Sequence, residues 1–235
     1  MDMSIIIPAH NESDYIGRTL DSLKVYAGLE VVVVADDCRD ATSVIARRAG
    51  VRVEQVAYGN AAQAKNRGFE VLEGRGNVMF LDADTTVPPD LLYPIDRIMH
   101  CNGVSGKVAV EPDNQSKGAN AYYNWVNFCS WLSHHTTKVH SSLTNGAGAC
   151  MFGSYDVLDE IRTEREYLFD PTVEMFEDQE LIAQLHKKGR FDFVNIPGLR
   201  VTTSTRRFDQ EGFWGRFLKD WVQLAGFKKE RLNVR

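Results

Sequence analysis

Short apolar runs alternate with segments of helical periodicity along the first hundred residues of the chain. Four runs are continuously apolar or alternate with a period of two, which predicts strands at Ser4–Ile7, Glu30–Ala35, Val51–Val56 and Asn77–Leu81. Apolar positions three or four residues apart predict helices between them, at 14–26, 40–49 and 60–73. Strands that alternate with helices predict right-handed crossovers and a mostly parallel sheet, so the expected fold class is α/β.

The second half of the chain has a less regular pattern. Its predicted elements are a strand at 104–110 and helices at 118–134, 177–188 and 210–227. The segment Thr144–Ala149 is rich in glycine and alanine, and we expect a flexible loop there. Because no repeat, linker or low-complexity segment divides the sequence, we expect residues 1–235 to form one domain.

The last predicted helix is amphipathic and is followed by basic residues. A broad apolar face with two tryptophans precedes Lys228, Lys229 and Arg231. A helix of this kind can lie on a membrane surface, which would make the protein a peripheral membrane protein. The interpretation that we favour is packing of this face on the domain itself or on a second subunit of a homodimer.

Composition and charge exclude several classes of protein. Apolar residues make up 43% of the chain and charged residues 25%, as in ordinary folded proteins. The formal net charge of −5 provides no basic field that would attract nucleic acid. The four cysteines lack the spacing of a zinc site or redox motif and indicate a reducing compartment. Without a signal peptide or an apolar run near ~20 residues, we expect a cytoplasmic protein.

Acidic side chains follow the predicted strands at the points where the strands end. Asp36 and Asp37 follow the second strand, and Asp82 and Asp84 follow the fourth. In parallel sheets ligands bind beyond the carboxyl ends of the strands. Two carboxylates separated by one residue offer the hard oxygen ligands that suit Mg²⁺ or Mn²⁺ together with substrate phosphates. The alternative is that Asp84 merely begins the turn before the two prolines at 88 and 89.

Four sequence motifs occur in order along this half of the chain. They are Ser4-Ile-Ile-Ile-Pro-Ala-His-Asn-Glu12, the acidic turn at 35–42, Asn60-Ala-Ala-Gln-Ala-Lys-Asn-Arg-Gly68 and Phe80-Leu-Asp-Ala-Asp84. In this order and at these intervals they resemble the family 2 glycosyltransferases, which have the nucleotide-diphospho-sugar transferase (GT-A) fold. The resemblance is strong over residues 3–95 and continues to about residue 208. It implies a Rossmann-like, mostly parallel central sheet flanked by helices.

The resemblance implies a nucleotide-sugar site in residues 1–100 and an acceptor site in residues 101–235. The residues that would contact the donor are Pro8, Ala9, Glu12, Asp36, Asp37, Lys65, Asp82 and Ala83. In this pattern Asp36 accepts a hydrogen bond from the N–H of a uracil or guanine ring. Each of these residues also has a simpler interpretation. The turn near residue 12 could only cap a helix, and Lys65 could be a solvated helix lysine. Asp36 and Asp37 could form a solvated turn or contain the phosphate-accepting aspartate of a receiver domain.

The family pattern also implies a catalytic base and a metal ion. Glu177-Asp178 resembles its Glu-Asp element, in which the aspartate is the base, although carboxylates also favour helix N-termini through the helix dipole. Mn²⁺ or Mg²⁺ would bind at Asp84 and Asp82. The chain departs from the pattern at 201–208, where it has no histidine as a further metal ligand. Arg206 and Arg207 there could bind the diphosphate instead, or form an ordinary basic surface.

The function that these residues imply is transfer of a sugar from a UDP-, GDP- or TDP-linked donor to a hydroxyl group. The acceptor would be a glycan, a lipid-linked sugar or another hydroxyl compound, and the reaction would invert the anomeric carbon. A retaining reaction is a variant of this hypothesis. A sugar-phosphate nucleotidyltransferase would need a glycine-rich phosphate loop, and the segment Pro8–Glu12 has no glycine. A non-catalytic binding protein on the same scaffold would fail to bind a nucleotide sugar.

Overall fold

The structure is a computed structural model of the whole chain. It describes residues 2–73, 76–101, 104–114, 116–135, 148–173 and 177–206, together with 209, 212 and 215. The predicted C-terminal helix at 210–227 lies outside the described residues except for 212 and 215. Arg207 also lies outside them. The proposals of a membrane contact or a homodimer through that helix therefore stay predictions.

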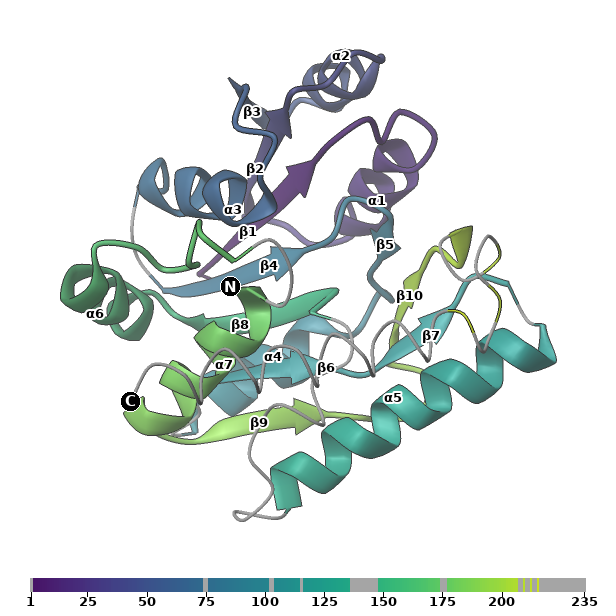
Figure 1. Cartoon of the computed structure of the whole chain (residues 1–235), viewed down its shortest axis with the longest axis vertical. Helices are drawn as coiled ribbons and strands as arrows, with labels where there is room; N and C mark the ends of the chain where they lie inside the picture. Colours follow the sequence, from purple (N-terminus) through teal and green to yellow (C-terminus); the bar gives the residue numbers. More distant parts are fainter. Residues whose placement is uncertain are drawn as a thin grey trace.

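A large sheet occupies the centre of the described structure (Figure 1). Its seven strands lie in the order β3-β2-β1-β4-β8-β6-β9. Their bounds are Met3–Ala9 (β1), Glu30–Asp36 (β2), Arg52–Val56 (β3), Asn77–Leu81 (β4), Ser105–Val108 (β6), Cys150–Ser154 (β8) and Phe191–Val194 (β9). β8 runs antiparallel to β4 and β6, and the other described pairings are parallel. The predicted α/β fold with a mostly parallel sheet is confirmed.

Helices cover both faces of this sheet (Figure 1). They are Ile16–Leu23 (α1), Thr42–Arg48 (α2), Ala61–Glu70 (α3), Leu92–His100 (α4), Lys117–His135 (α5), Tyr155–Arg165 (α6) and Glu177–Lys188 (α7). Alternate residues of β1 point to opposite faces, as the period of a strand requires. Ile5 and Ile7 pack with α1 and α4, whereas Ile6 packs with α3, α6 and α7.

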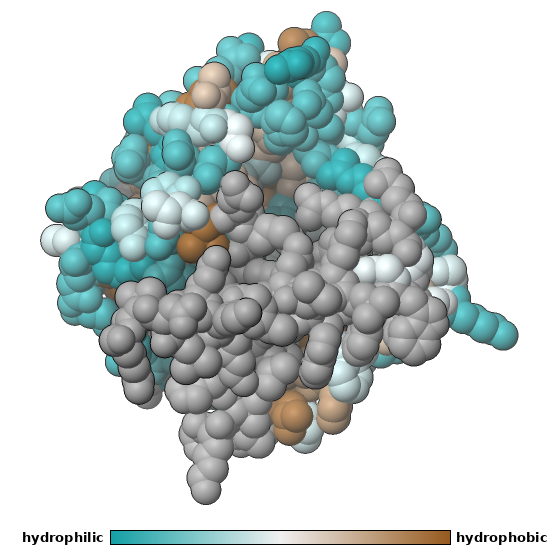
Figure 2. Space-filling view, viewed as in Figure 1, coloured by the Kyte–Doolittle hydropathy of each residue, from teal (hydrophilic) through white to brown (hydrophobic). Residues whose placement is uncertain are grey.

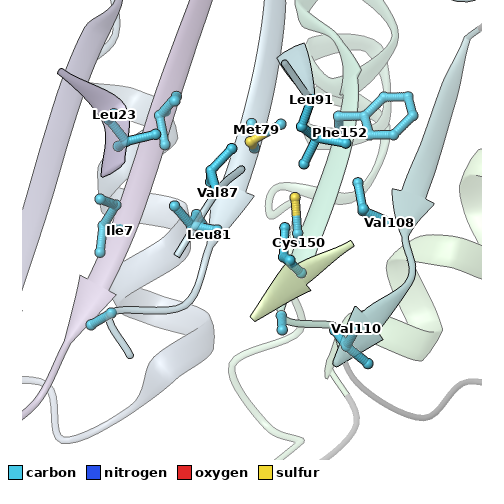
Figure 3. Close-up of a cluster of buried hydrophobic side chains, with 14 of the residues drawn as sticks. Ile7, Leu23, Met79, Leu81, Val87, Leu91, Val108, Val110, Cys150 and Phe152 are labelled. Carbon is cyan, nitrogen blue, oxygen red and sulfur yellow. The ribbon is translucent and has the colours of Figure 1, made fainter. Parts of the chain in front are cut away.

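Two apolar clusters therefore form the core, one on each side of the sheet. Figure 3 shows part of the first cluster, in which Ile7, Met79 and Leu81 of the parallel strands meet Cys150 and Phe152 of β8. Each fully buried side chain of this size contributes roughly 1.5–3 kcal/mol of transfer free energy. Outside the core, described side chains around α2 are mostly hydrophilic (Figure 2). None of the helices in the described ranges combines the length and hydropathy of a membrane span.

A small second sheet joins the two halves of the chain beside the main one (Figure 1). It consists of β5 (Thr85–Thr86), β10 (Val201–Thr203) and β7 (Val110–Pro112), in the order β5-β10-β7. The hydroxyls of Thr85 and Thr203 lie 3.0 Å apart. Since β5 directly follows the Asp-x-Asp turn, this pairing holds the residues after β10 close to that turn.

Candidate active site

The Asp-x-Asp turn is fixed to the surrounding structure through its backbone. The amide of Asp82 donates to the carbonyl of Ala149 at 3.0 Å, and the carbonyl of Asp82 accepts from the amide of Thr85 at 3.1 Å. The carbonyl of Ala83 accepts from the hydroxyl of Thr19 at 2.7 Å. These bonds connect the turn to the residue before β8, to β5 and to α1, so its backbone is held in place at the carboxyl end of β4.

Arg206 connects the last described segment to this turn and to the end of β1. Its Nη1 donates to Oε2 of Glu12 at 2.7 Å, and its Nη2 donates to Oε1 of the same carboxylate. Nη2 also lies 3.5 Å from Oδ2 of Asp84, and the guanidinium lies over the ring of Tyr15 at 4.9 Å. The hydrogen bonds to Glu12 raise the pKa of Arg206. The structure thus brings together Glu12, Asp84 and Arg206, three residues that the sequence analysis singled out.

The other predicted donor residues on β1 lie close to this group. Pro8 and Ala9 form the end of β1, where they pair with Val34 and Ala35 of β2. The carbonyl of Ala9 accepts from the thiol of Cys38 at 3.3 Å. Ala9 is buried, so its contribution to a pocket wall would come from its backbone.

Asp36 and Asp37, at the end of β2, have different surroundings. The buried carboxylate of Asp36 accepts three backbone N–H bonds from residues 58–60, at 2.6, 3.0 and 2.8 Å. Asp37 has a positive φ of 46°, and its side chain is 45% exposed. Asp36 therefore holds the segment that leads into α3, and Asp37 is the more accessible of the two to a ligand. The predicted contact of Asp36 with a base stays a prediction.

Lys65 of α3 meets the predicted catalytic pair at the start of α7. Its Nζ donates to Oε1 of Glu177 at 2.9 Å and to Oδ1 of Asp178 at 2.5 Å. The ammonium also lies 4.9 Å from the centroid of the Phe169 ring. The sequence analysis expected Lys65 to contact the nucleotide, whereas here two of its three N–H donors are bound to carboxylates more than 110 positions away in the chain.

Burial and shared charge determine how these groups titrate. Burial opposes the charge of Lys65, but the carboxylates of Asp178, Glu177 and Asp82 raise the pKa of Lys65 above its usual range. Burial raises the pKa of Asp178 to about 7; Lys65 opposes this rise, and Glu177 and Asp82 add to it. Burial is the main cause, because it disfavours the charged carboxylate, and the neighbouring carboxylates that share one ammonium add to the rise. Asp178 can therefore exchange a proton near neutral pH.

Gly148, just before β8, completes the surroundings of Asp178. A Cβ atom at this position would lie 1.8 Å from Oδ2 and 2.4 Å from Cγ of Asp178. The carboxylate thus packs directly against the glycine backbone. The sequence analysis assigned Gly148 only to a flexible loop, because nothing in the local sequence indicates a close approach from a residue 30 positions later.

The carboxylates of the Asp-x-Asp turn fit a divalent cation of the Mg²⁺ or Mn²⁺ type. Such ions need only one or two protein carboxylates when phosphate oxygens and waters supply the remaining ligands. Within the described residues no group of three or more His, Cys, Asp or Glu side chains could hold a metal ion by itself. Asp82 and Asp84 therefore suit an ion that arrives with a diphosphate, and not a site made entirely of protein ligands.

The sequence profile of "Glycosyl transferase family 2" matches residues 4–162, which include all four donor-side motifs. The chain belongs to this family. The 4,4'-diaponeurosporenoate glycosyltransferase of Staphylococcus haemolyticus is 26% identical over 233 residues, which are 96% of this chain and 58% of that protein. The succinoglycan biosynthesis protein ExoO of Rhizobium meliloti is 33% identical over 116 residues, which are 47% of this chain and 32% of that protein.

Solved structures have the same fold as this family 2 chain. S. aureus TarS residues 1–349 superpose with a TM-score of 0.67 at 16% identity, covering 95% of this chain and 63% of that one. Glucosyl-3-phosphoglycerate synthase from Mycobacterium tuberculosis, in complex with Mn²⁺, UDP and phosphoglyceric acid, gives 0.64 at 18% identity, covering 95% and 78%. These likenesses confirm the GT-A fold. The chain spans between 28% and 58% of the length of the first three curated relatives that it matches.

Proposed function

We propose that this family 2 protein transfers a sugar from a nucleotide-diphosphate donor to an acceptor hydroxyl, with inversion at the anomeric carbon and Asp178 as the general base. The observation that carries the proposal is the buried contact of Lys65 with Glu177 and Asp178 at the edge of the sheet where the Asp-x-Asp turn lies. Solved structures with this fold contain UDP-N-acetylglucosamine in TarS and UDP with Mn²⁺ in the mycobacterial synthase.

The surroundings of Asp178 suit the role of a base. A sugar hydroxyl is a weak nucleophile until a positioned group removes its proton, and a base works best when its pKa lies near the working pH. Burial raises the pKa of Asp178 to about 7, close to that optimum. Lys65 holds one carboxylate oxygen, and the backbone of Gly148 packs against the other. The carboxylate is therefore kept in one position, which lowers the entropic cost of reaching a reactive geometry.

The donor would bind across the ends of β1, β2 and β4. We assign Asp37, with its exposed side chain, as the acceptor of the N–H of a uracil or guanine ring, and Asp36 as the support of the adjoining segment. Arg206 would turn part of its guanidinium toward the diphosphate, because arginine forks match phosphate oxygens. Asp82 and Asp84 would hold Mn²⁺ or Mg²⁺, which would stabilise the negative charge of the leaving diphosphate.

Calorimetry with UDP and GDP tests the donor site. We expect nucleotide binding in Mn²⁺ that weakens at least about tenfold in EDTA, and an Asp84→Asn variant that behaves in Mn²⁺ as the wild type does in EDTA. Lys24→Gln is the control, since Lys24 forms an exposed pair with Asp21 on α1. Equal affinities with and without Mn²⁺ would remove the metal from the proposal. Failure of both nucleotides to bind, and of TDP in the same assay, would reject the transferase function.

The products of turnover test the stereochemistry. Once a donor sugar is known, NMR of the anomeric proton of the product shows whether the configuration at the anomeric carbon has changed. We expect inversion, because a single displacement assisted by Asp178 needs no covalent intermediate. Retention of configuration would show that Asp178 does not act as proposed.

A further inference from the structure

Lys107 of β6 is a buried lysine that the proposed reaction leaves unused. The residue is 3% exposed, and its Nζ has no hydrogen-bond partner within the described residues. Lys107 pairs in register with Met151 of β8 and Phe193 of β9. Nζ lies 5.8 Å from the centroid of the Phe193 ring. Since Met151 packs with Leu181 of α7, Lys107 lies on the face of the sheet that α7 covers.

The groups that interact electrostatically with Lys107 leave its charge without a partner. They are Asp178 and His186 of α7 and Cys129 of α5, and His134 of α5 acts in turn on His186. Asp178 is the carboxylate among them, but it is already bound to Lys65 and packed against Gly148. Burial lowers the pKa of Lys107 to about 8, although Asp178 and Cys129 act in the opposite direction.

A buried ammonium without a hydrogen-bond acceptor, as Lys107 is within the described part of the chain, is costly. Removing an ionised group from water without a hydrogen-bonded partner opposes folding, and an apolar residue of the same length would avoid that cost. Buried polar groups in proteins are normally satisfied, so an exception beside a reactive group indicates a ligand. The ligand that would satisfy an ammonium here is an anion.

The position of Lys107 relative to the donor residues indicates which substrate carries that anion. In the sheet order β4-β8-β6, Lys107 is two strands away from the Asp-x-Asp strand (Figure 1). Two strand spacings amount to about 10 Å. The donor diphosphate would lie at β4 and Arg206, whereas Lys107 lies on the side of Asp178. The acceptor hydroxyl must approach Asp178, so this is the acceptor side of the proposed reaction.

We propose that Lys107 binds an anionic oxygen group of the acceptor, a carboxylate or a phosphate, beside the general base. This inference rests on the proposed transferase function and adds a substrate class to it: a hydroxyl compound that also carries a carboxylate or a phosphate. The anion selects the acceptor and orients its hydroxyl toward Asp178. Lys107 is thus a specificity-determining residue, and it takes no part in the proton transfer.

Three small hydroxyl compounds test this inference: glycerol is neutral, glycerate carries a carboxylate and glycerol 3-phosphate carries a phosphate. Their binding is measured by ligand-observed NMR, with and without UDP or GDP and Mn²⁺. The proteins are the wild type, Lys107→Met, Lys107→Gln and Lys187→Met. Lys187 is the matched control because it is an exposed lysine of α7 whose Nζ bonds only the side chain of Gln184 among the contacts described.

In the wild type we expect at least one of the two anions to bind at least about tenfold more tightly than glycerol. Lys107→Met and Lys107→Gln should lose that preference while nucleotide affinity and glycerol binding stay unchanged, and Lys187→Met should keep it. Loss for only one anion distinguishes a carboxylate acceptor from a phosphate acceptor. Lys107→Met should also melt at the same temperature as the wild type or higher, because it removes a buried charge.

The inference is overturned if the wild type has no preference for either anion, or if the preference persists in folded Lys107→Gln. A melting temperature of Lys107→Met well below that of the wild type would also overturn it, since Lys107 would then have a structural role. Nucleotide binding separates the two proposals. Intact nucleotide binding without an anion preference rejects only the acceptor inference, whereas failure of UDP, GDP and TDP all to bind rejects the transferase function itself.

Discussion

The contact between Gly148 and Asp178 predicts the effect of adding a single methyl group. In Gly148→Ala the new Cβ would meet Oδ2 of Asp178 at 1.8 Å, whereas an ordinary contact needs at least 3.4 Å. The oxygen or the backbone must therefore move by about 1.6 Å, the difference between 3.4 Å and 1.8 Å. Because Oδ1 lies 2.5 Å from Lys65, a shift of the carboxylate also disturbs that ion pair.

The expected loss of activity follows from this displacement. A misplacement of about 1 Å in a reacting group can reduce the rate about 10²-fold. We therefore expect kcat of Gly148→Ala to fall by about 10² or more, with nucleotide affinity within about twofold of the wild type. The clash is with Asp178, on the proposed acceptor side, so we expect Asp37, Asp84 and Arg206 to keep their positions.

Gly153→Ala, in β8 five positions after Gly148, is the matched control. A Cβ at Gly153 would lie 3.4 Å from side-chain atoms of Leu158, which is close to an ordinary contact. The assay is steady-state transfer with UDP or GDP sugars, accompanied by thermal melting of both variants. If Gly148→Ala kept the kcat and melting temperature of the wild type, the packing of Gly148 against Asp178 would have no role in catalysis, and the reasoning would be refuted.

Further predictions concern the base, the arginine and the two aspartates after β2. Because protonated Asp178 cannot act as a base, kcat of the wild type should fall about tenfold per pH unit below about 7 in a rate–pH profile. In steady-state assays Asp178→Asn should lose about 10²–10⁴ in kcat, and Glu177→Gln should lose less. Arg206→Ala should raise the Kd for UDP or GDP about tenfold in calorimetry, since it removes positive charge beside Asp84. Asp36→Ala should lower the free energy of unfolding by about 3 kcal/mol in urea titrations, because three backbone donors lose their acceptor. Asp37→Asn, which suits the positive φ of 46° at this position, should leave stability unchanged and weaken nucleotide binding.

The raised pKa of Asp178 has opposite consequences for stability and activity. A carboxyl group whose folded pKa is raised contributes stability that is fully present below its unfolded pKa of ~4. That contribution is lost as the pH rises through about 7, where the group ionises in the folded protein. We expect activity to rise over the same interval, because ionised Asp178 is the active form in the proposed reaction. Burial of the base thus costs stability at the pH at which the enzyme would work.

Elements with a strong local pattern were predictable from the sequence. The strand predicted at Asn77–Leu81 and the helix predicted at 177–188 have the same bounds in the structure, and those in the first half differ by a few residues. The elements that were not predicted are β5, α4, β8, α6, β9 and β10. β8 contains a glycine and depends on pairing with β4 and β6, and such tertiary pairing determines strand formation more than local propensity does.

The candidate site was predictable as a set of residues but not as a set of contacts. The motifs identified the Asp-x-Asp turn, Glu12, Lys65 and Asp178. They gave no indication that Lys65 would bind Asp178 or that Arg206 would bind Glu12, because these partners are 113 and 194 positions apart. Lys107 was not predicted as a site residue, because a single lysine within the predicted strand at 104–110 has no distinguishing sequence pattern.

The balance of charge at this edge of the sheet gives a physical reason for a metal ion. Glu12, Asp82, Asp84, Glu177 and Asp178 are five carboxylates, and the basic side chains bound among them are Lys65 and Arg206. With all groups ionised these side chains carry a net charge of −3, and a proton on Asp178 reduces it only to −2. A diphosphate would be repelled by such a site, since like charges in a poorly solvated environment interact strongly. A divalent cation between the carboxylates and the phosphates removes this repulsion. The dependence of nucleotide affinity on Mn²⁺ that we predict therefore has a reason in the composition of the site, independent of any relative.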